Sequence, residues 1–391
     1  MLNRRILRVK AMQALYSYFT AQESLKNVIN EQLESHYYMD AAKDDFSEVD
    51  IFTARRKSAS ALYHKFLNVR KVSAPEDIED DIAENVQSHI NKYYTELDKE
   101  LRAIEQAMIK DVDGLEDIYL KLVQLTVEIS HIEKQEKEKK EKAHLPKVSY
   151  WKNHFIDNPV IDSLTKFEAF NNLLIARKVS WEHDLGQIRS WYKDIIQNDE
   201  FLIAYQRKET PTVEDHQEAI IYLYKKLIFK NEVIGDFLSS VDLHWSENQP
   251  ILKSLVVKTF QEYEPSLDDP FVMKEVSRNE DDDIGFFKKL FKETVKKEKE
   301  LDEIISSHTR NWDISRVAVT DRIILRMSLA EMMVFHSIPV KVTINEFLEI
   351  SKVYSTPKSK QFINGILDVL AKELTSEGLI KKSGRGLIDN K

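Results

Sequence analysis

The chain has 391 residues, of which 42% are hydrophobic and 31% charged, and its formal net charge is −9. This length is enough for two or three domains, and the scarcity of Gly (8) and Pro (9) favours long helices over the tight turns of all-β folds. The sequence contains no cysteine, which excludes disulfides, thiolate zinc sites and a cysteine nucleophile. No apolar run approaches the roughly 18 residues that span a bilayer, so we expect no membrane segment.

The N-terminal segment, residues 3–21, is predicted to form an amphipathic helix with Asn3 as its N-cap. Its arginines stand three or four residues apart and share one flank of the first turns. Residues 1–20 contain no acid, so any RNA site of this acidic chain is expected to be a local basic patch. A signal peptide is disfavoured because Gln13 interrupts the apolar stretch and no small-residue cleavage site follows.

The middle of the chain is predicted to be helical throughout. One helix is expected over residues 54–69, and Pro75 is the expected start of the next. Apolar residues then step by four and three from Leu97 to Ile132, interrupted by Asp113-Gly114, which predicts a helical hairpin near 97–142. Residues 150–263 are again helical and rich in aromatic side chains.

Residues 283–375 are predicted to form the last helical block. Thr343 and Glu346 have capping-box spacing at the start of one helix, and Thr356-Pro357 is the expected start of the final helix. Gly365 lies inside that helix at a cost of about 1 kcal/mol relative to Ala, which indicates close approach of a neighbouring helix or a ligand. Residues 376–391 are expected to be a disordered tail.

Two segments show a weak internal similarity. Ser239-Ser240 followed by Trp245 recurs as Ser306-Ser307 followed by Trp312. A duplicated helical unit and chance likeness between amphipathic helices both explain this pattern.

Two segments at opposite ends of the chain resemble the NusB family of transcription antitermination proteins. The first is Asn3-Arg-Arg-Ile-Leu-Arg-Val-Lys-Ala-Met-Gln-Ala-Leu-Tyr16, which is similar to the family's arginine-rich helix. The second runs through Asp321-Arg-Ile-Ile-Leu-Arg326, Ile338-Pro-Val-Lys-Val-Thr-Ile-Asn-Glu346 and Lys358-Ser-Lys-Gln-Phe-Ile-Asn-Gly-Ile-Leu-Asp368.

The resemblance implies an all-α, NusB-like helical bundle with a large inserted helical region. A discontinuous RNA- and partner-binding domain would comprise residues 1–21 and 283–375, and residues 22–282 would be the insertion. The sequence leaves open whether this insertion forms a domain of its own.

The resemblance also implies an RNA site at both ends of the chain. In the family the matching arginines contact the boxA element of ribosomal RNA leader transcripts, and guanidinium groups suit phosphates and unpaired bases. The implied RNA-binding residues are Arg4, Arg5, Arg8, Lys10, Gln13, Lys358, Ser359, Gln361 and Phe362. A solvated basic helix flank is the alternative for the arginines. Gln13 could point to either face, and Phe362 could stack on a base or lie in the core.

Asp321 and Arg322 are the implied partner-binding residues, which would help to hold ribosomal protein NusE within an RNA polymerase antitermination complex. Exposed charges with no specific role are the alternative. The expected function is therefore a cytoplasmic, RNA-binding antitermination factor that promotes processive rRNA transcription.

We weighed two other functions. A cytosine-5 RNA methyltransferase with a NusB-like domain needs a cysteine nucleophile, which the chain lacks, so we expect no enzyme. We also expect no cofactor and no metal, because the histidines show no metal-binding spacing and Asp111-Val-Asp-Gly114 has its glycine at the wrong position for a calcium loop. A helical protein–protein adaptor that acts through the insertion remains the alternative function, since the heptad-like spacing at 118–132 serves an interface or an internal bundle.

Overall fold

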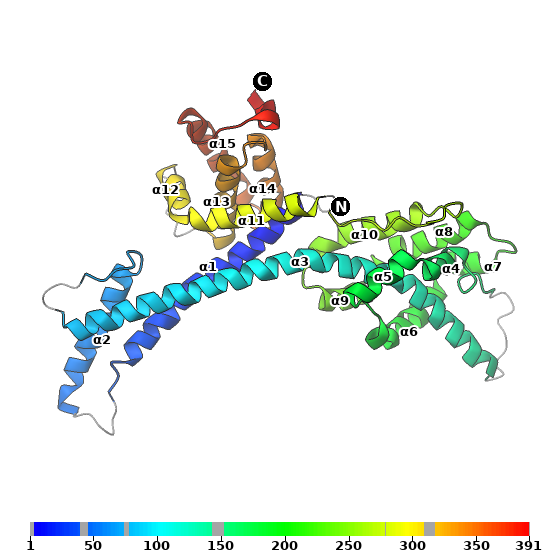
Figure 1. The fold of residues 1–391 in the computed structure, drawn as a ribbon, viewed down its shortest axis with the longest axis horizontal. Coiled ribbons are helices and arrows are strands. Elements are labelled where there is room, and N and C mark those ends of the chain that lie inside the picture. The colour runs from blue at the N-terminus through cyan, green and yellow to red at the C-terminus, as the bar shows by residue number, and fades with distance from the viewer. Residues whose placement is uncertain are drawn as a thin grey trace. The chain divides into compact units, whose positions relative to one another are not determined.

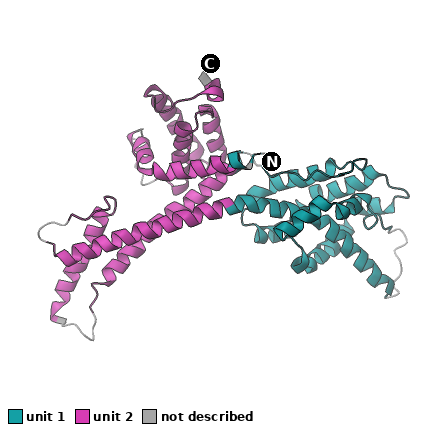
Figure 2. Cartoon of the chain, in the orientation of Figure 1, with its two compact units in different colours: residues 1–6, 110–283 teal, residues 7–109, 284–391 magenta. Residues whose placement is uncertain are grey.

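A computed structural model describes residues 4–39, 46–73, 78–142, 152–277, 279–308 and 317–390. These residues form helices joined by turns and contain no strand, so the expected all-α fold is confirmed for the described ranges (Figure 1). They divide into two compact units, which Figure 2 colours separately. Unit 1 comprises residues 1–6 and 110–283, and unit 2 comprises residues 7–109 and 284–391. The expected insertion, residues 22–282, is thus shared between both units.

Unit 1 is built around the second part of one long helix, α3 (Asp80–Lys142). Its core is rich in aromatic rings: Trp181 and Trp191 meet edge to face, and Tyr224 stacks on Phe260. All four of these side chains are almost completely buried, which accounts for the aromatic-rich composition of this part of the sequence. The other helices are α4 (Pro159–Lys166), α5 (Glu168–Arg177), α6 (Leu185–Asp194), α7 (Glu200–Arg207), α8 (Val213–Tyr222), a π-helical turn (Leu223–Ile228), α9 (Glu232–Val241) and α10 (Trp245–Gln261).

The predicted helical hairpin at 97–142 is wrong, because α3 runs through Asp113-Gly114 without a break. Apolar residues continue in phase across the glycine, with Met108, Val112 and Leu115 all buried. One glycine costs a helix only about 1 kcal/mol, which is less than the burial of one large apolar side chain contributes. The apolar spacing from Leu97 to Ile132 therefore belongs to a single helix, whose first part lies in unit 2 and whose second part lies in unit 1.

Unit 2 combines the N-terminal helices with the C-terminal block. The N-terminal helix is longer than predicted, and the described residues of the predicted block 283–375 lie mainly in five helices. The elements are α1 (Arg4–Ser35), α2 (Val49–Phe66), the first part of α3, α11 (Glu280–Lys296), α12 (Glu298–His308), α13 (Val319–Val334), α14 (Val340–Tyr354) and α15 (Ser359–Ser376). Asn3, Pro75 and Trp312 lie outside the described residues.

Helix α13 forms the centre of the C-terminal block and is buried along most of its length. It carries charged side chains into this core. Arg326 is 2% exposed, donates hydrogen bonds to both carboxylate oxygens of Asp302 on α12, and lies 4.4 Å from the ring centre of Phe19 on α1. Paired charges thus link α13 to its neighbours inside unit 2.

Two local predictions in the C-terminal block are wrong. Helix α14 begins at Val340, so Thr343 lies inside the helix and is not its N-cap. The tail is not disordered through residue 390: Ile380 is buried, and residues 384–390 form a 3-10 helix. The tail docks on the end of α13, where the Ser383 amide donates to the His336 carbonyl at 3.0 Å. A Cβ at Gly386 would lie 2.1 Å from that same oxygen, so this contact requires glycine.

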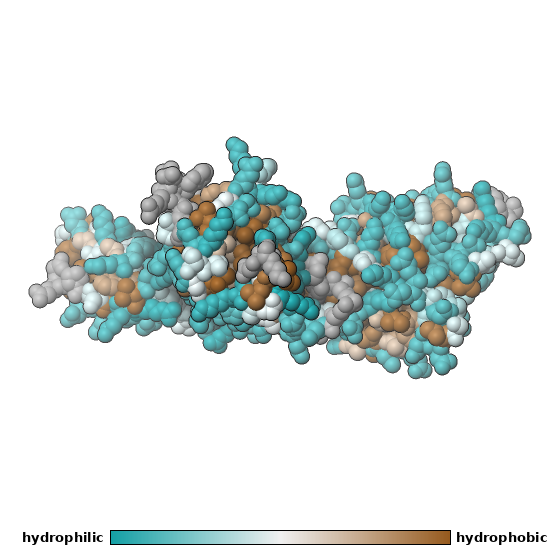
Figure 3. Space-filling view, turned by 90° about the horizontal axis from the view of Figure 1, so that it is seen from above, coloured by the Kyte–Doolittle hydropathy of each residue, from teal (hydrophilic) through white to brown (hydrophobic). Residues whose placement is uncertain are grey.

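Hydrophilic side chains cover most of the face drawn in Figure 3, and hydrophobic side chains appear there as separate patches. Within the described ranges, no helix is long and apolar enough to cross a membrane. The same ranges contain no cluster of three or more acidic or histidine side chains arranged to hold a metal ion.

Candidate nucleic-acid interface

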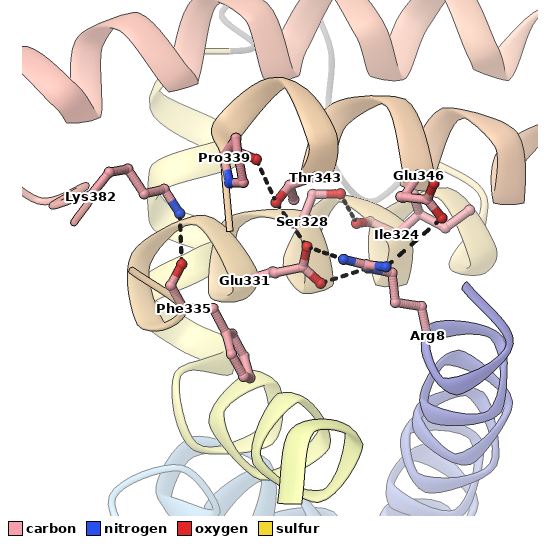
Figure 4. A network of polar contacts seen from close by, with 9 residues as sticks. All are labelled: Arg8, Ile324, Ser328, Glu331, Phe335, Pro339, Thr343, Glu346 and Lys382. Atoms are coloured by element: carbon pink, nitrogen blue, oxygen red, sulfur yellow. Dashed lines mark hydrogen bonds and ion pairs between the residues drawn. The ribbon is translucent and has the colours of Figure 1, made fainter. Parts of the chain in front are cut away.

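Arg8 is the best-defined of the predicted site residues, and it lies inside the protein. Its side chain is 3% exposed and its Nε and Nη2 atoms donate to the two carboxylate oxygens of Glu331, both at 2.7 Å. Figure 4 shows this pair with Thr343, whose hydroxyl donates to the same carboxylate at 2.8 Å. The Glu331 carboxylate is fully buried. A buried charge costs free energy unless it is paired and hydrogen-bonded, and Arg8 and Thr343 provide both here.

Further groups surround the Arg8 guanidinium. Glu346 of α14 lies 3.8 Å from Nη1, and the rings of Phe286 and Phe347 have their centres 5.3 and 5.9 Å from the guanidinium carbon. These contacts come from α11, α13 and α14. Arg8 therefore holds α1 against the C-terminal block, and its contact with RNA stays a prediction.

The sequence contained a signal for this structural role. Arg8 is followed by Met12, Leu15 and Phe19 at helical spacing, and all three are buried. It therefore stands on the apolar stripe of α1. Lys10 is also buried, at 3% exposure, and its contact with RNA stays a prediction.

Other predicted residues of α1 remain on the surface. Arg5 is exposed, and Arg4 pairs with Asp282 at 2.6 Å in an ion pair whose side chains are 39% and 61% exposed. Gln13 is half-buried, and Tyr16, the last residue of the NusB-like segment, is 47% exposed. These residues are accessible to a ligand of the α1 surface.

Asp321 was expected to face a protein partner, but it is 5% exposed and serves the fold. Its carboxylate accepts hydrogen bonds from Ser355 and, at 2.6 Å, from Ser359. The Ser359 hydroxyl also forms a hydrogen bond of 2.8 Å with the Thr356 hydroxyl. This cluster joins the start of α13 to the turn between α14 and α15. The predicted roles of Asp321 in partner binding and of Ser359 in RNA binding stay predictions. Arg322, the neighbouring partner candidate, is half-buried.

The start of α15 presents the remaining candidates. Lys358 and Gln361 are exposed and Phe362 is half-buried. Lys358 occupies the N-cap position, before the first helical residue, Ser359. Gly365 follows one turn after Gln361 and is exposed, and a Cβ at this position would meet nothing within 4 Å. The predicted close approach at Gly365 is therefore absent from the described contacts, and this face of α15 is open.

The C-terminal helices, onto which the buried ion pair of Arg8 and Glu331 fastens α1, lie in a part of the chain that is similar to a known family. Residues 246–372 match the family model described as the NusB family. This part of the chain is therefore similar to the NusB family, and the rest of the described helices lies outside the match.

Three curated relatives share this similarity, each described as a transcription antitermination protein NusB. The protein of Salinibacter ruber is 47% identical over 103 residues, which are 26% of this chain and 64% of the relative. That of Chloroherpeton thalassium is 42% identical over 104 residues, 27% of this chain and 49% of the relative. That of Koribacter versatilis is 47% identical over 88 residues, 22% of this chain and 60% of the relative.

The chain thus spans about half to two thirds of the length of these relatives. Among solved structures, T. maritima NusB is 25% identical, with coverage of 42% of this chain and 94% of that chain and a TM-score of 0.23.

Proposed function

We propose that this protein is a cytoplasmic, non-enzymatic transcription antitermination factor that binds boxA-like single-stranded RNA together with ribosomal protein NusE. The observation that carries the proposal is the match of residues 246–372 to the NusB family, whose curated members named above are antitermination proteins. The acid-free first 20 residues add physical support, because their guanidinium groups pair with phosphates and stack on unpaired bases.

The burial of Arg8 and Lys10 narrows the set of RNA contacts. We assign the RNA to the accessible candidates, which are Arg4, Arg5 and Gln13 on α1 and Lys358, Gln361 and Phe362 on α15. Arg4 would exchange its exposed pair with Asp282 for a phosphate, which costs little because such surface pairs contribute under about 1 kcal/mol. Lys358 and the N-terminus of α15 would attract phosphate in the same way.

Partner binding is the second part of the proposal. NusE would add protein surface to the RNA complex, and the assembly would join RNA polymerase. Since Asp321 is buried, we assign the partner contact to Arg322, which is half-buried, and to the exposed surface around it.

The test is a titration of fluorescent boxA-type RNA with and without NusE, at several salt concentrations. Removing two phosphate contacts by Arg4→Ala/Arg5→Ala should flatten the slope of log affinity against log salt by about 1.4, from about 0.7 for each contact on a single strand. Lys358→Asp should also weaken binding. The matched control is Lys99→Ala/Arg102→Ala, which removes two exposed charges from α3.

RNA affinity that NusE increases, and that the two test variants weaken more than the control, supports the proposal. If the folded protein shows no preference for RNA in either condition, the proposal is wrong, and an adaptor function of the additional helical region takes its place.

A further inference from the structure

A second basic surface lies on α2, outside the residues that match the NusB family. Residues 51–75 contain no aspartate or glutamate, although the whole chain has a net charge of −9. The basic residues of this stretch are Arg55, Arg56, Lys57, His64, Lys65, Arg70 and Lys71. An acid-free stretch in an acidic chain indicates a local attraction for polyanions.

Exposed residues of the second half of α2 and of the turn after it form one stripe. Lys57, Ala61, Lys65 and Asn68 follow one another at helical spacing, and His64 lies beside Lys65; all five are exposed. Small and basic side chains thus follow one another along this face from Lys57 onward, and the acid of the first turn, Asp50, is exposed at its other end. A polyanion that lies along the part from Lys57 to Lys65 meets no acid of α2 there.

Most of these cations are not neutralised within the fold. Arg55 pairs with Glu79 at 2.8 Å and with Asp81, both at the start of α3. Across the described ranges, by contrast, no carboxylate pairs with Lys57, Lys65 or Lys71. The exposed charge of the stripe is therefore available to a ligand.

Arg70, just beyond the end of α2, has an unusual backbone conformation. Its φ is +66°, the left-handed region in which a helix usually places glycine. A residue with a side chain costs about 1 kcal/mol or more there. Its amide donates to the Phe66 carbonyl at 3.0 Å, so the residue closes the helix in the manner of a glycine cap.

The Arg70 side chain is held in place and remains exposed. Its guanidinium carbon lies 4.0 Å from the centre of the Tyr94 ring, and the Tyr94 hydroxyl donates to the Leu67 carbonyl at 2.7 Å. Gln87 braces the same loop: its amide donates to the Arg70 carbonyl at 3.0 Å, and its oxygen accepts from the Val72 amide at 2.8 Å. An arginine stacked on an aromatic ring is a common element of surfaces that bind unpaired bases.

Helix stability explains only part of this arrangement. Cations in the last turn of a helix interact favourably with its dipole by about 0.3–1 kcal/mol, which accounts for Lys65. This effect does not reach Lys57, two turns earlier. It also does not account for an arginine at a left-handed position where glycine would remove the strain.

We propose that the α2 surface, defined as Lys57, Lys65, Arg70, Lys71 and Tyr94, is a second binding surface for single-stranded RNA. Its lysines would contact phosphates, and Arg70 on Tyr94 would stack on a base. The inference rests on the proposed function, because it assumes that RNA also binds the NusB family domain. The surface would then hold a further part of a longer transcript and raise its affinity through a second attachment.

The experiment measures affinity for two RNAs, a boxA-type 12-mer and a 40-mer that extends it with unstructured uridines. Lys57→Gln/Lys65→Gln/Lys71→Gln should weaken the 40-mer at least tenfold and flatten its salt slope by about 2, from about 0.7 for each lost phosphate contact. The 12-mer should bind as it does to the parent. The matched control, Lys99→Gln/Arg102→Gln/Lys166→Gln, removes three exposed charges elsewhere and should leave both affinities unchanged.

Arg70→Gly separates folding from binding. Glycine relieves the left-handed strain, so thermal stability should stay the same or rise while affinity for the 40-mer falls about threefold or more.

If neither α2 variant changes the affinity for the 40-mer, the inference is overturned and the proposed function still stands. If neither RNA binds the parent, both proposals are wrong. If the control variant weakens binding of the 40-mer as much as the α2 triple variant does, the RNA is attracted by general charge and not by a defined surface. This result would also overturn the inference.

Discussion

Helices α1 and α2 each carry a basic, acid-free segment, but the two segments use their charges in opposite ways. On α1, Arg8 and Lys10 are buried, and Arg8 forms a bidentate ion pair with a fully buried glutamate. On α2, Lys57 and Lys65 are exposed and pair with no carboxylate in the described ranges. Two segments that are both basic and acid-free therefore differ in how far the fold buries and pairs their charges.

The difference follows from where each cation stands relative to the apolar stripe of its helix. Arg8 is in phase with Met12 and Leu15, so burying the stripe carries the guanidinium into the core. Lys57 and Lys65 are out of phase with the buried residues Leu62 and Phe66 and stay in solvent. The position of a charged residue relative to the apolar stripe decides whether its side chain is buried in the fold or stays in solvent. The number of charged residues on the helix decides this less.

The largest expected effect comes from breaking the buried pair of α1. Arg8→Ala leaves Glu331 buried without its cation, which should lower the free energy of unfolding by about 3–5 kcal/mol. Urea unfolding followed by circular dichroism measures this. The control is Arg4→Ala, which removes an exposed pair and should cost less than about 1 kcal/mol.

A double change sharpens the same comparison. Arg8→Met/Glu331→Leu replaces the pair with apolar side chains of similar size and should recover most of the lost stability. If Arg8→Ala lowers the free energy of unfolding as little as Arg4→Ala does, the structural role of Arg8 is contradicted.

An intermediate effect is expected at Asp321, another charge that the sequence placed on the surface and the fold buries. Asp321→Ala leaves the Ser355 and Ser359 hydroxyls without their acceptor, which should cost about 1–3 kcal/mol. Asp321→Asn keeps one acceptor oxygen and should cost less. If unfolding is unchanged while binding of NusE falls, Asp321 would act as a partner contact after all.

The smallest effect is expected on the open face of α15. Gly365→Ala should raise the free energy of unfolding by about 1 kcal/mol, because a Cβ meets nothing there and alanine favours the helix. Thermal unfolding and RNA titration are measured together. Unchanged RNA affinity would place the bound RNA away from this position, whereas stabilisation with weaker binding would place the RNA against Gly365.

The sequence by itself determined the fold class and indicated the family that part of the chain resembles. Low glycine and proline content and the 3.6-residue apolar periodicity indicate helices, because these are local properties of the chain. The segments around Asp321-Arg-Ile-Ile-Leu-Arg326 and Lys358–Asp368 indicated the NusB family, and the family match over residues 246–372 agrees.

The tertiary structure decided which of the candidate residues are accessible. Arg8, Lys10, Asp321 and Ser359 read as surface residues because charged and hydroxyl side chains are usually exposed. Their burial depends on partners hundreds or tens of residues away, such as Glu331 for Arg8. Gly114 gave a similar error, since its local cost predicted a turn that long-range packing of α3 outweighed. Local patterns determine helices, but only the packing of distant segments determines which charges the core can pair.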